Sequence, residues 1–383
     1  MTLARGLRRL GRRLLRPGLA RAVAGAGAPR HALLLYTVRA FTEAAAWRHQ
    51  NVAQQRELAS ALGERGYEVD VVDFDETRRR LLPRDYDLVV DLHPRSDPLY
   101  GDRLRPGALR IAYLTGSRPA FSDAAERERL DDLERRRGMR LRPRRQVGRF
   151  EDEVLAGYDA LFYFGESTTF STFAGVRLPP SHALPNSGYE VEPTGAVLRD
   201  PHRFLFLGGF GQVHKGLDLL LELFASEPDL RLDVCTNLSG EPDFARAYRA
   251  ELTATPNIRV HGFMDVQSPA FRELQARCGA MILPSCSEGQ SGTVTVAMGY
   301  GLPCVVSRWC GFDDPGVTVL PDCRPETLRA TVRALVGLPS SELARRAEET
   351  LALFRRRYRP GHYAAAVRAA LRDTLARAGG STP

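Results

Sequence analysis

Two successions of short apolar segments, each alternating with helical segments, constrain the fold of this chain more than any other feature. In the first half, the predicted strands are residues 32–38, 68–73, 87–92, 110–114 and 160–164. In the second half, they are residues 204–207, 230–235, 258–260, 280–283 and 303–306. The predicted helices are residues 51–65, 122–137, 217–225, 242–254, 268–277, 293–300, 325–335, 340–356 and 362–377. This alternation is typical of parallel sheets that are covered by crossover helices.

A turn-rich break separates the two successions. It reads Leu184-Pro185-Asn186-Ser187-Gly188, and a chain of 383 residues is too long for one ordinary core. We therefore expect an α/β fold with two Rossmann-like domains that face a central cleft. The expected domains are residues 31–190 and residues 191–358, followed by a helix over residues 359–383 that packs back on the first domain.

The net charge of +8 comes from a basic tail. Residues 1–30 carry eight arginines and no acid, so the totals of 54 basic and 46 acidic residues leave 46 of each elsewhere. A neutral body argues against a nucleic-acid partner. The tail fits either an amphipathic helix on an anionic membrane surface or a disordered basic leader. We expect a cytoplasmic protein, and the tail is the candidate for peripheral attachment to the inner face of the plasma membrane.

Six cysteines occur without any C-x-x-C pair. Their positions are 235, 278, 286, 304, 310 and 323. This spacing predicts neither a disulfide framework nor a zinc site, and it favours small buried thiols in a reducing compartment.

The single lysine of the chain lies in a glycine-rich segment. Gly208-Gly209-Phe210-Gly211 follows a predicted strand, and Lys215-Gly216 precedes a predicted helix. Glycines let backbone amides approach a phosphate closely, and a helix N-terminus adds positive potential. Lysine supplies a compact point charge in a chain whose other 53 strong cations are arginines. The segment is neither a P-loop nor a G-x-G-x-x-G fingerprint, and it predicts a phosphate site of another kind.

A second motif follows a later strand. Ser285 precedes Glu288, and the glycine- and hydroxyl-rich residues 289–293 open a predicted helix. The amides of this turn can bind an anion, and Glu288 can accept hydrogen bonds from sugar hydroxyls. A capping role is the alternative for this carboxylate.

Together the two motifs resemble the nucleotide-sugar half of GT-B glycosyltransferases, specifically the retaining family 4. The resemblance covers most of residues 200–310, including the stretch 297–306, and the break at 184–188 resembles the family's hinge. It implies that the second domain binds a nucleotide-diphosphate sugar as co-substrate, with no other cofactor and no metal site. It also implies that the first domain binds a glycan, lipid-linked or small-molecule acceptor.

The resemblance assigns roles residue by residue. Lys215 would hold the donor diphosphate, and Glu288 would contact the transferred sugar. The donor-binding candidates are Gly208, Gly209, Phe210, Gly211, Gly216, Thr236, Asn237, Phe263, Ser285, Gly289, Gln290, Ser291, Gly292 and Thr293. The acceptor-side candidates, at strand ends of the first domain, are His93, Thr115, Ser117 and Arg118.

Two positions depart from the family pattern. Gly209 stands where the family has a second phosphate-binding arginine, and Val296 stands where it has a ribose-binding glutamate. Arg118 and Arg308 are candidates to replace the missing cation.

We therefore expect a hexosyltransferase-type enzyme, retaining and independent of metal, that acts in polysaccharide biosynthesis. The missing arginine and glutamate leave an inactive nucleotide-sugar or polyanion binding protein as the alternative. An epimerase of the same fold stays open. A dinucleotide oxidoreductase is disfavoured, because no glycine fingerprint follows the first strand. Seven arginines over residues 135–145 predict either a solvated helix and loop or a basic lip for an anionic acceptor.

Overall fold

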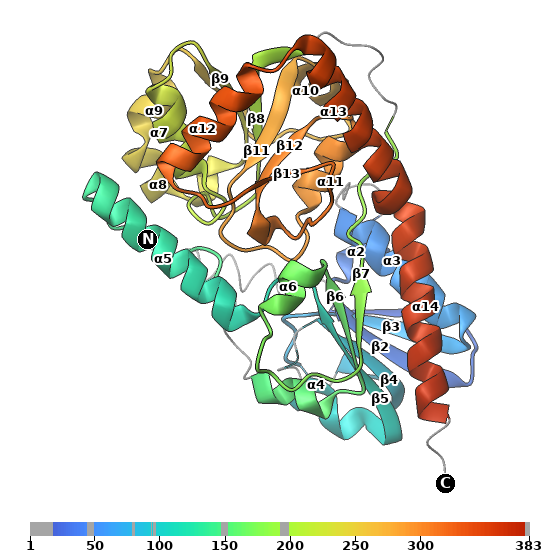
Figure 1. The fold of residues 1–383 in the computed structure, drawn as a ribbon. Coiled ribbons are helices and arrows are strands. Elements are labelled where there is room, and N and C mark those ends of the chain that lie inside the picture. The colour runs from blue at the N-terminus through green and yellow to red at the C-terminus, as the bar shows by residue number, and fades with distance from the viewer. Residues whose placement is uncertain are drawn as a thin grey trace.

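The computed structural model describes residues 18–43, 50–78, 81–92, 94, 97–146, 152–191 and 199–379. Within these ranges the chain forms two α/β domains, each built around its own sheet (Figure 1). The protein has the GT-B architecture that the sequence predicted, with two Rossmann-like domains.

The N-terminal sheet contains seven strands in the described residues, in the order β1-β3-β2-β4-β5-β6-β7. They are β1 Leu19–Ala24, β2 Arg30–Tyr36, β3 Tyr67–Asp73, β4 Tyr86–Asp91, β5 Leu104–Leu114, β6 Ala160–Phe164 and β7 Ser181–Leu184. All neighbouring strands are parallel except β1, which is antiparallel to β3. The interior strands are buried, as the apolar segments of the sequence predicted.

β1 corrects the prediction of a tail over residues 1–30. Residues 1–17 lie outside the described residues, but Leu19 and Ala20 are in register with Val72 and Val71 of β3. This edge strand carries mostly small side chains and only Ala20 is buried in it. The sequence signal was therefore weak, and the strand depends on the backbone groups that β3 offers.

The C-terminal sheet contains six parallel strands in the described residues, in the order β10-β9-β8-β11-β12-β13. They are β8 Asp200–Leu207, β9 Arg231–Cys235, β10 Ile258–Val260, β11 Cys278–Leu283, β12 Cys304–Ser307 and β13 Thr318–Leu320. The sequence predicted five of these strands and missed β13, an edge strand of three residues in which only Leu320 is buried.

The longer helices cover the two sheets (Figure 1). Those of the first half are α2 Arg39–Thr42, α3 Gln50–Glu64, α4 Asp97–Tyr100, α5 Pro119–Arg137 and α6 Ser167–Ser171. Those of the second half are α7 Leu217–Ala225, α8 Pro242–Ala247, α9 Arg249–Thr253, α10 Pro269–Ala276, α11 Gly292–Gly299, α12 Pro325–Val336, α13 Ser340–Leu353 and α14 Pro360–Gly379. The segment 242–254, predicted as one helix, forms both α8 and α9.

α14 returns to the N-terminal domain. A π-helical turn, Phe354–Tyr358, follows α13, and α14 then packs beside α3 (Figure 1). The hydroxyl groups of Tyr363 and Tyr113 lie 3.0 Å apart in the N-terminal core. The chain therefore links its two domains twice, at residues 184–200 and at 354–360.

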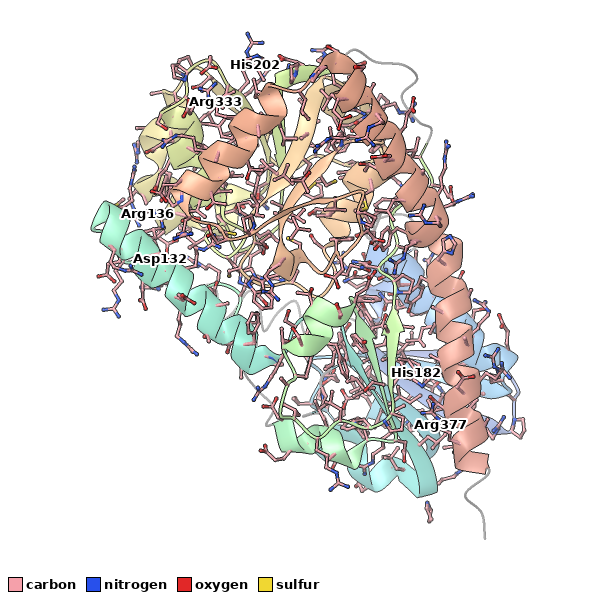
Figure 2. The ribbon with its side chains drawn as sticks, in the orientation of Figure 1. Asp132, Arg136, His182, His202, Arg333 and Arg377 are labelled. Atoms are coloured by element: carbon pink, nitrogen blue, oxygen red, sulfur yellow. The ribbon has the colours of Figure 1, made fainter. Side chains whose placement is uncertain are left out.

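α5 forms a third connection, which the sequence did not predict. It leaves the N-terminal domain after β5 and runs along the C-terminal domain (Figure 1). Leu130 and Leu133 are part of the C-terminal core. Arg136 extends from α5 toward the second domain (Figure 2) and lies 2.6 Å from Asp218 and 2.9 Å from Glu222 of α7.

Arginines at the end of α5 and in the segment after it form ion pairs with the second domain. Arg137 pairs with Glu251 at 2.7 Å, and Arg144 pairs with Asp243. These arginines therefore form neither a fully solvated face nor a free basic lip. α5 and the segment after it thus contact the C-terminal domain although they precede the boundary predicted at residue 190.

All six cysteines are free thiols, and five are buried, as the sequence predicted. Burial raises the pKa of Cys286 and of Cys310 to about 12, so both stay protonated and act as small apolar groups. No helix within the described residues is both long and apolar enough to cross a lipid bilayer.

Candidate active site

The candidate site lies where the strand order of the C-terminal sheet reverses. From β8 the chain adds β9 and β10 on one side, and from β11 it adds β12 and β13 on the other. β8 and β11 are parallel neighbours, so the segments that follow them leave the same edge of the sheet. Such a switch point is where open α/β sheets bind ligands. Residues 208–216 follow β8, residues 284–292 follow β11, and the fold brings the two predicted motifs together.

Lys215 and Glu288 form a buried ion pair at this edge. Nζ of Lys215 lies 2.5 Å from Oε1 of Glu288, and the two side chains are 8% and 11% exposed. The Ser285 hydroxyl donates to the same carboxylate oxygen at 2.9 Å. The structure thus joins the lysine and the carboxylate that the sequence singled out across 73 positions.

The charge states at the pair follow from its neighbours. Burial alone would raise the pKa of Glu288, but Lys215, Arg145 and His214 outweigh it and lower the pKa to about 2. Burial lowers the pKa of His214 to about 4, and Arg145 and Lys215 add to this effect. At pH 7 the carboxylate is ionised and the imidazole is neutral. Nε2 of His214 donates to the Ser287 carbonyl at 2.6 Å, which fixes the tautomer.

The glycine loop, residues 208–212, is held from inside its own domain. The amides of Gly211 and Gln212 donate to the buried carboxylate of Glu241 at 2.6 and 3.1 Å. The Gly209 carbonyl accepts hydrogen bonds from Thr236 Oγ1 and Gln212 Nε2, both at 2.9 Å. The Gly211 amide is therefore already bound, and Thr236 supports the loop.

Residues 288–293, the catalytic turn, are held from the other domain. Four backbone carbonyls of this turn accept hydrogen bonds from side chains that precede the C-terminal domain. The pairs are Glu288 with Ser117 Oγ, Gly289 with Thr169 Oγ1 at 2.6 Å, Gln290 with Asn186 Nδ2 at 2.6 Å, and Gly292 with Gln50 Nε2 at 2.9 Å. The amides of Gly292 and Thr293 begin α11, where a helix offers them no internal acceptor.

The other predicted residues of the turn act within the fold. The Ser291 amide donates to the Cys310 carbonyl at 3.0 Å. Oε1 of Gln290 accepts a hydrogen bond from the Asn186 amide at 2.7 Å. Val296, at the position of the family's second glutamate, is part of the hydrophobic core. This side of the site therefore offers no ribose-binding carboxylate at that position.

Several donor-side candidates lie at the open rim of the glycine loop. A Cβ at Gly209 would meet no atom within 4 Å. Phe210 and Phe263 are 45% and 81% exposed. Gly216 precedes α7 at φ 77°, and a Cβ there would lie 2.6 Å from the Pro284 carbonyl oxygen, so glycine is required. The Asn237 side chain accepts a hydrogen bond from the Ser239 amide at 3.0 Å and caps a short 3₁₀ turn.

Of the acceptor-side candidates, Thr115 and Ser117 contact the turn, whereas Arg118 forms an ion pair elsewhere. A Cβ at Gly289 would lie 2.6 Å from the Thr115 carbonyl oxygen, so the end of β5 touches the catalytic turn. Ser117 binds the turn directly. Arg118 instead donates to Asp152 through Nε at 2.8 Å. His93 lies outside the described residues.

Two residues of the site were missed by sequence reasoning. His214 sits inside the lysine motif, where its position next to Lys215 was the available signal. Arg145 lies at the end of the arginine-rich segment, and its Cδ would lie 3.0 Å from a Cβ at Gly211. Its contact with the glycine loop comes from the return of the chain after α5, which composition does not reveal.

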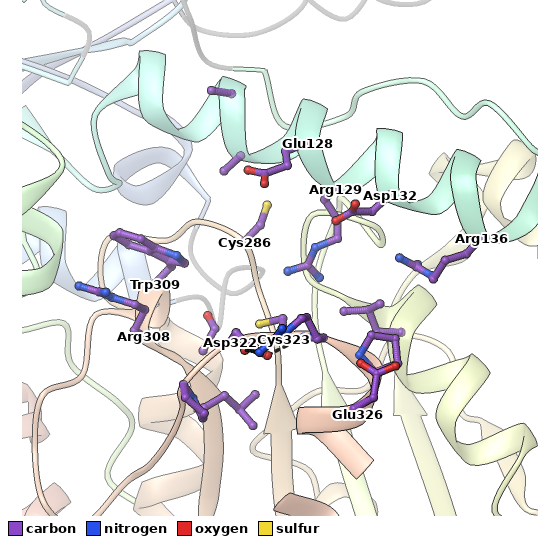
Figure 3. Close-up of a pocket in the computed structure, with 18 of the residues that line it drawn as sticks. Glu128, Arg129, Asp132, Arg136, Cys286, Arg308, Trp309, Asp322, Cys323 and Glu326 are labelled. Atoms are coloured by element: carbon purple, nitrogen blue, oxygen red, sulfur yellow. Dashed lines mark hydrogen bonds and ion pairs between the residues drawn. The ribbon is translucent and has the colours of Figure 1, made fainter. Parts of the chain in front are cut away.

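A cavity of about 830 Å³ lies beside this site, between α5 and the segments that follow β12 and β13 (Figure 3). Trp309 and Arg308 line one side of it, and Arg129 and Glu128 extend toward it from α5. Of the two replacement cations considered from the sequence, Arg308 lines this cavity, whereas none of the predicted donor-binding or acceptor-side residues does. We place the candidate active site at Lys215 and Glu288, because the switch point and the charged pair coincide there.

Comparisons with known proteins bear on the family and the fold. Residues 201–337 match the family model of glycosyl transferases group 1. The chain has the GT-B fold, and this part of it is similar to group 1 glycosyl transferases. Both motifs of this GT-B protein fall inside the matched residues.

Solved structures show the same fold at low sequence identity. Sucrose-phosphate synthase from Thermosynechococcus elongatus superposes with a TM-score of 0.64 at 12% identity, over 91% of this chain and 100% of that one. HepE from Anabaena, solved with UDP-glucose, gives 0.59 at 13% identity over 90% and 100%.

TarM of S. aureus is a longer relative in fold. It gives a TM-score of 0.54 at 11% identity over 76% of this chain. This chain spans 54% of the length of TarM. No curated protein is similar enough in sequence to match this chain.

Proposed function

We propose that this protein is a glycosyltransferase that moves a hexose from a nucleotide-diphosphate sugar to an acceptor hydroxyl, with retention and without a dedicated metal ion. The observation that carries this proposal is the Lys215–Glu288 pair, 2.5 Å apart at the switch point of a group 1 domain. Solved proteins of the same fold include one bound to UDP-glucose.

The leaving diphosphate gains negative charge when the sugar–phosphate bond breaks. Lys215 is the cation nearest to the catalytic turn, and the first amides of α11 add the positive end of a helix. These groups are fixed before the reaction, so they stabilise the transition state without a reorganisation cost. This arrangement supports transfer by electrostatic stabilisation.

Glu288 is ionised in the resting protein, with its pKa lowered to about 2 by its cationic neighbours against the effect of burial. An ionised carboxylate accepts hydrogen bonds and donates none. We assign it to hydroxyl groups of the transferred sugar, which it orients while Lys215 turns to the diphosphate.

Retention follows if the acceptor enters on the face from which the diphosphate leaves. The bond between the anomeric carbon and the phosphate oxygen breaks with its electron pair on the phosphate. The acceptor oxygen forms the new bond to the anomeric carbon, and its proton passes to the leaving phosphate. This step needs no additional base.

The acceptor would approach from the N-terminal domain, where Thr115 and Ser117 meet the catalytic turn. The exposed rings of Phe210 and Phe263 are the candidates to contact the base, because aromatic faces stack on any base.

Donor binding gives the first test. A thermal-shift screen against UDP-, GDP- and ADP-sugars should show one class that stabilises the protein. A ligand at 100 times its dissociation constant adds about 2.7 kcal/mol. Slow hydrolysis of that donor without acceptor should follow, and NMR of the released or transferred sugar reports the stereochemistry. Absence of both stabilisation and hydrolysis for all three classes contradicts the proposal.

For the tail, we propose that residues 1–17 bind an anionic membrane, which would place the enzyme near glycan or lipid-linked acceptors of polysaccharide biosynthesis in the cytoplasm. Six arginines in residues 1–17 support this proposal. The deletion should stop at residue 17, because Leu19–Ala24 is part of the sheet. Flotation with anionic and neutral vesicles should recover only the full chain on anionic vesicles, and equal recovery of both forms rejects the proposal.

A further inference from the structure

The donor site lacks a cation at the place where its glycine loop is most open. A Cβ added at Gly209 would meet no atom within 4 Å. Within residues 208–216, Lys215 is the single lysine or arginine. Lys215 is also paired with Glu288 in the resting protein. A diphosphate carries more negative charge than one lysine neutralises, so a second cation is expected near this loop.

Arg145 reaches this loop from the N-terminal half of the chain. Its side-chain stem fills the space over Gly211, which has φ 90° and would place a Cβ 3.0 Å from Cδ of Arg145. Its positive charge acts on two groups of the candidate site. Next to burial, it is a further cause of the lowered pKa of His214. It also lowers the pKa of Glu288, against the effect of burial. Within the described part of the chain, no hydrogen bond or ion pair of the Arg145 guanidinium is found.

Arg145 is held in place through its backbone. The carboxylate of Glu126, on α5, is buried. It accepts the amide of Arg145 at 2.9 and 3.1 Å, the amide of Arg144 at 2.8 Å and Nε2 of Gln146 at 2.9 Å. Glu126 is therefore a positioning residue. It holds the segment that places the Arg145 side chain against the glycine loop.

The other nearby arginines are either paired or lie at the separate cavity. Arg118 is bound to Asp152, and Arg308 lies over the Trp309 ring at 4.7 Å, beside the separate cavity. Arg129 is buried and donates to the Pro284 carbonyl at 3.1 Å. Arg145 is the arginine of this group whose side chain contacts the glycine loop, and within the described residues no side chain pairs with its guanidinium.

We propose that Arg145 is the second cation of the donor diphosphate site, supplied in this chain by the segment after α5 and positioned by Glu126. This inference rests on the proposed function, because it concerns the same donor. It means that the N-terminal half of the chain completes the donor site of the C-terminal domain, in place of an arginine within the glycine loop.

The test compares binding of nucleoside diphosphates and nucleosides by calorimetry. The probes are UDP, GDP and ADP, each beside its nucleoside, and the proteins are the wild type, Arg145→Met, Arg145→Lys, Lys215→Met and Arg142→Met. Arg142 is exposed on the same segment, so its substitution is matched in charge. Circular dichroism and thermal unfolding establish that each variant is folded.

The expected result is a loss of at least about tenfold in diphosphate affinity for Arg145→Met, the loss that accompanies removal of one charge-assisted hydrogen bond. Nucleoside affinity should not change, Arg145→Lys should recover part of the loss, and Arg142→Met should bind like the wild type. Equal diphosphate affinity in the wild type and in Arg145→Met overturns the inference.

The two hypotheses fail in different ways. If Lys215→Met weakens diphosphate binding and Arg145→Met does not, the inference about Arg145 is wrong and the donor site stands. If neither variant changes the binding, or if no diphosphate binds the wild type, the donor site itself is misplaced and both proposals are rejected. Should Arg145→Met fail to fold, Arg145→Lys against Arg142→Lys decides, with a smaller expected loss at position 145 alone.

Discussion

The glycine loop and the catalytic turn are built from similar residues, yet they are anchored in opposite directions. The loop is fixed within the C-terminal domain, through the carboxylate of Glu241. The turn is fixed by side chains of the N-terminal domain and the hinge, among them Thr169 and Asn186. The difference teaches that the backbone of the glycine loop is fixed by one domain, while the turn also depends on how the two domains meet.

Lys215 joins the two halves, and its loss should have the largest effect. Lys215→Met should lower transfer by about 10²–10³-fold, the cost of removing one preorganised charge donor from a transition state. Lys215→Arg should also be impaired, because a planar guanidinium does not fit a site built around a compact ammonium. Initial rates of sugar transfer measure this effect.

A double variant separates chemistry from folding. Removing Lys215 alone leaves Glu288 without its partner, and an unpaired buried charge costs about 3–5 kcal/mol. Lys215→Met with Glu288→Gln should regain much of that stability without regaining activity. Activity that returns with stability would show that Lys215 is structural.

His214, beside Lys215, binds the Ser287 carbonyl just before the turn. Its titration makes the free energy of unfolding depend on pH. Its pKa is lowered to about 4 by burial, below the ordinary value of 6.5. The unfolded chain therefore binds a proton at higher pH than the folded protein does. The stability that the neutral imidazole contributes is complete above pH 6.5. It is lost as pH falls toward 4, by up to about 3 kcal/mol.

His214→Gln removes the titration and keeps a donor for the Ser287 carbonyl. The difference in unfolding free energy between wild type and variant, measured by urea titration at several pH values, should shrink between pH 6.5 and pH 4. A difference that stays constant over this range contradicts the assignment of a buried neutral imidazole.

Removal of Glu241, which anchors the glycine loop, should lower the stability of the C-terminal domain alone. Glu241→Ala leaves the buried amides of Gly211 and Gln212 without an acceptor, which costs about 1–3 kcal/mol. Thermal unfolding should show this loss. Ser239→Ala, in the neighbouring 3₁₀ turn, removes only a local hydroxyl contact and should change the stability little. Equal effects of both substitutions would mean that Glu241 does not hold the loop.

Removal of the Thr169 hydroxyl, which anchors the turn, should give the smallest loss of stability. Its effect should be specific to the contact between the two domains. Thr169→Val removes the hydrogen bond to the Gly289 carbonyl at nearly constant volume, for about 1 kcal/mol. Small-angle scattering should then show a more open molecule, because this bond joins the two domains. The matched control is Ser171→Ala on α6, whose hydroxyl bonds only to the Thr168 carbonyl. An unchanged scattering profile for Thr169→Val would remove the distinction between the two anchors.

The sequence by itself determined the alternation of strands and helices and the two motifs. Buried parallel strands such as β6 and β11 appear as continuous apolar segments, because both faces of each are covered. Lys215 and Glu288 were recognisable because each follows a strand and precedes a helix, and parallel strands end at a common edge. The strand pattern therefore contained both the fold class and the central pair of the site.

Only the tertiary structure decided which groups surround that pair. The packing of α5 on the C-terminal core, through Leu130 and Leu133, places Arg145 over Gly211. Glu241 and Glu126 are acids whose neighbours in sequence give no sign of the amides they bind. The physical reason is that a single buried carboxylate satisfies backbone groups far away in the chain, and such long-range contacts leave no periodic pattern in the sequence.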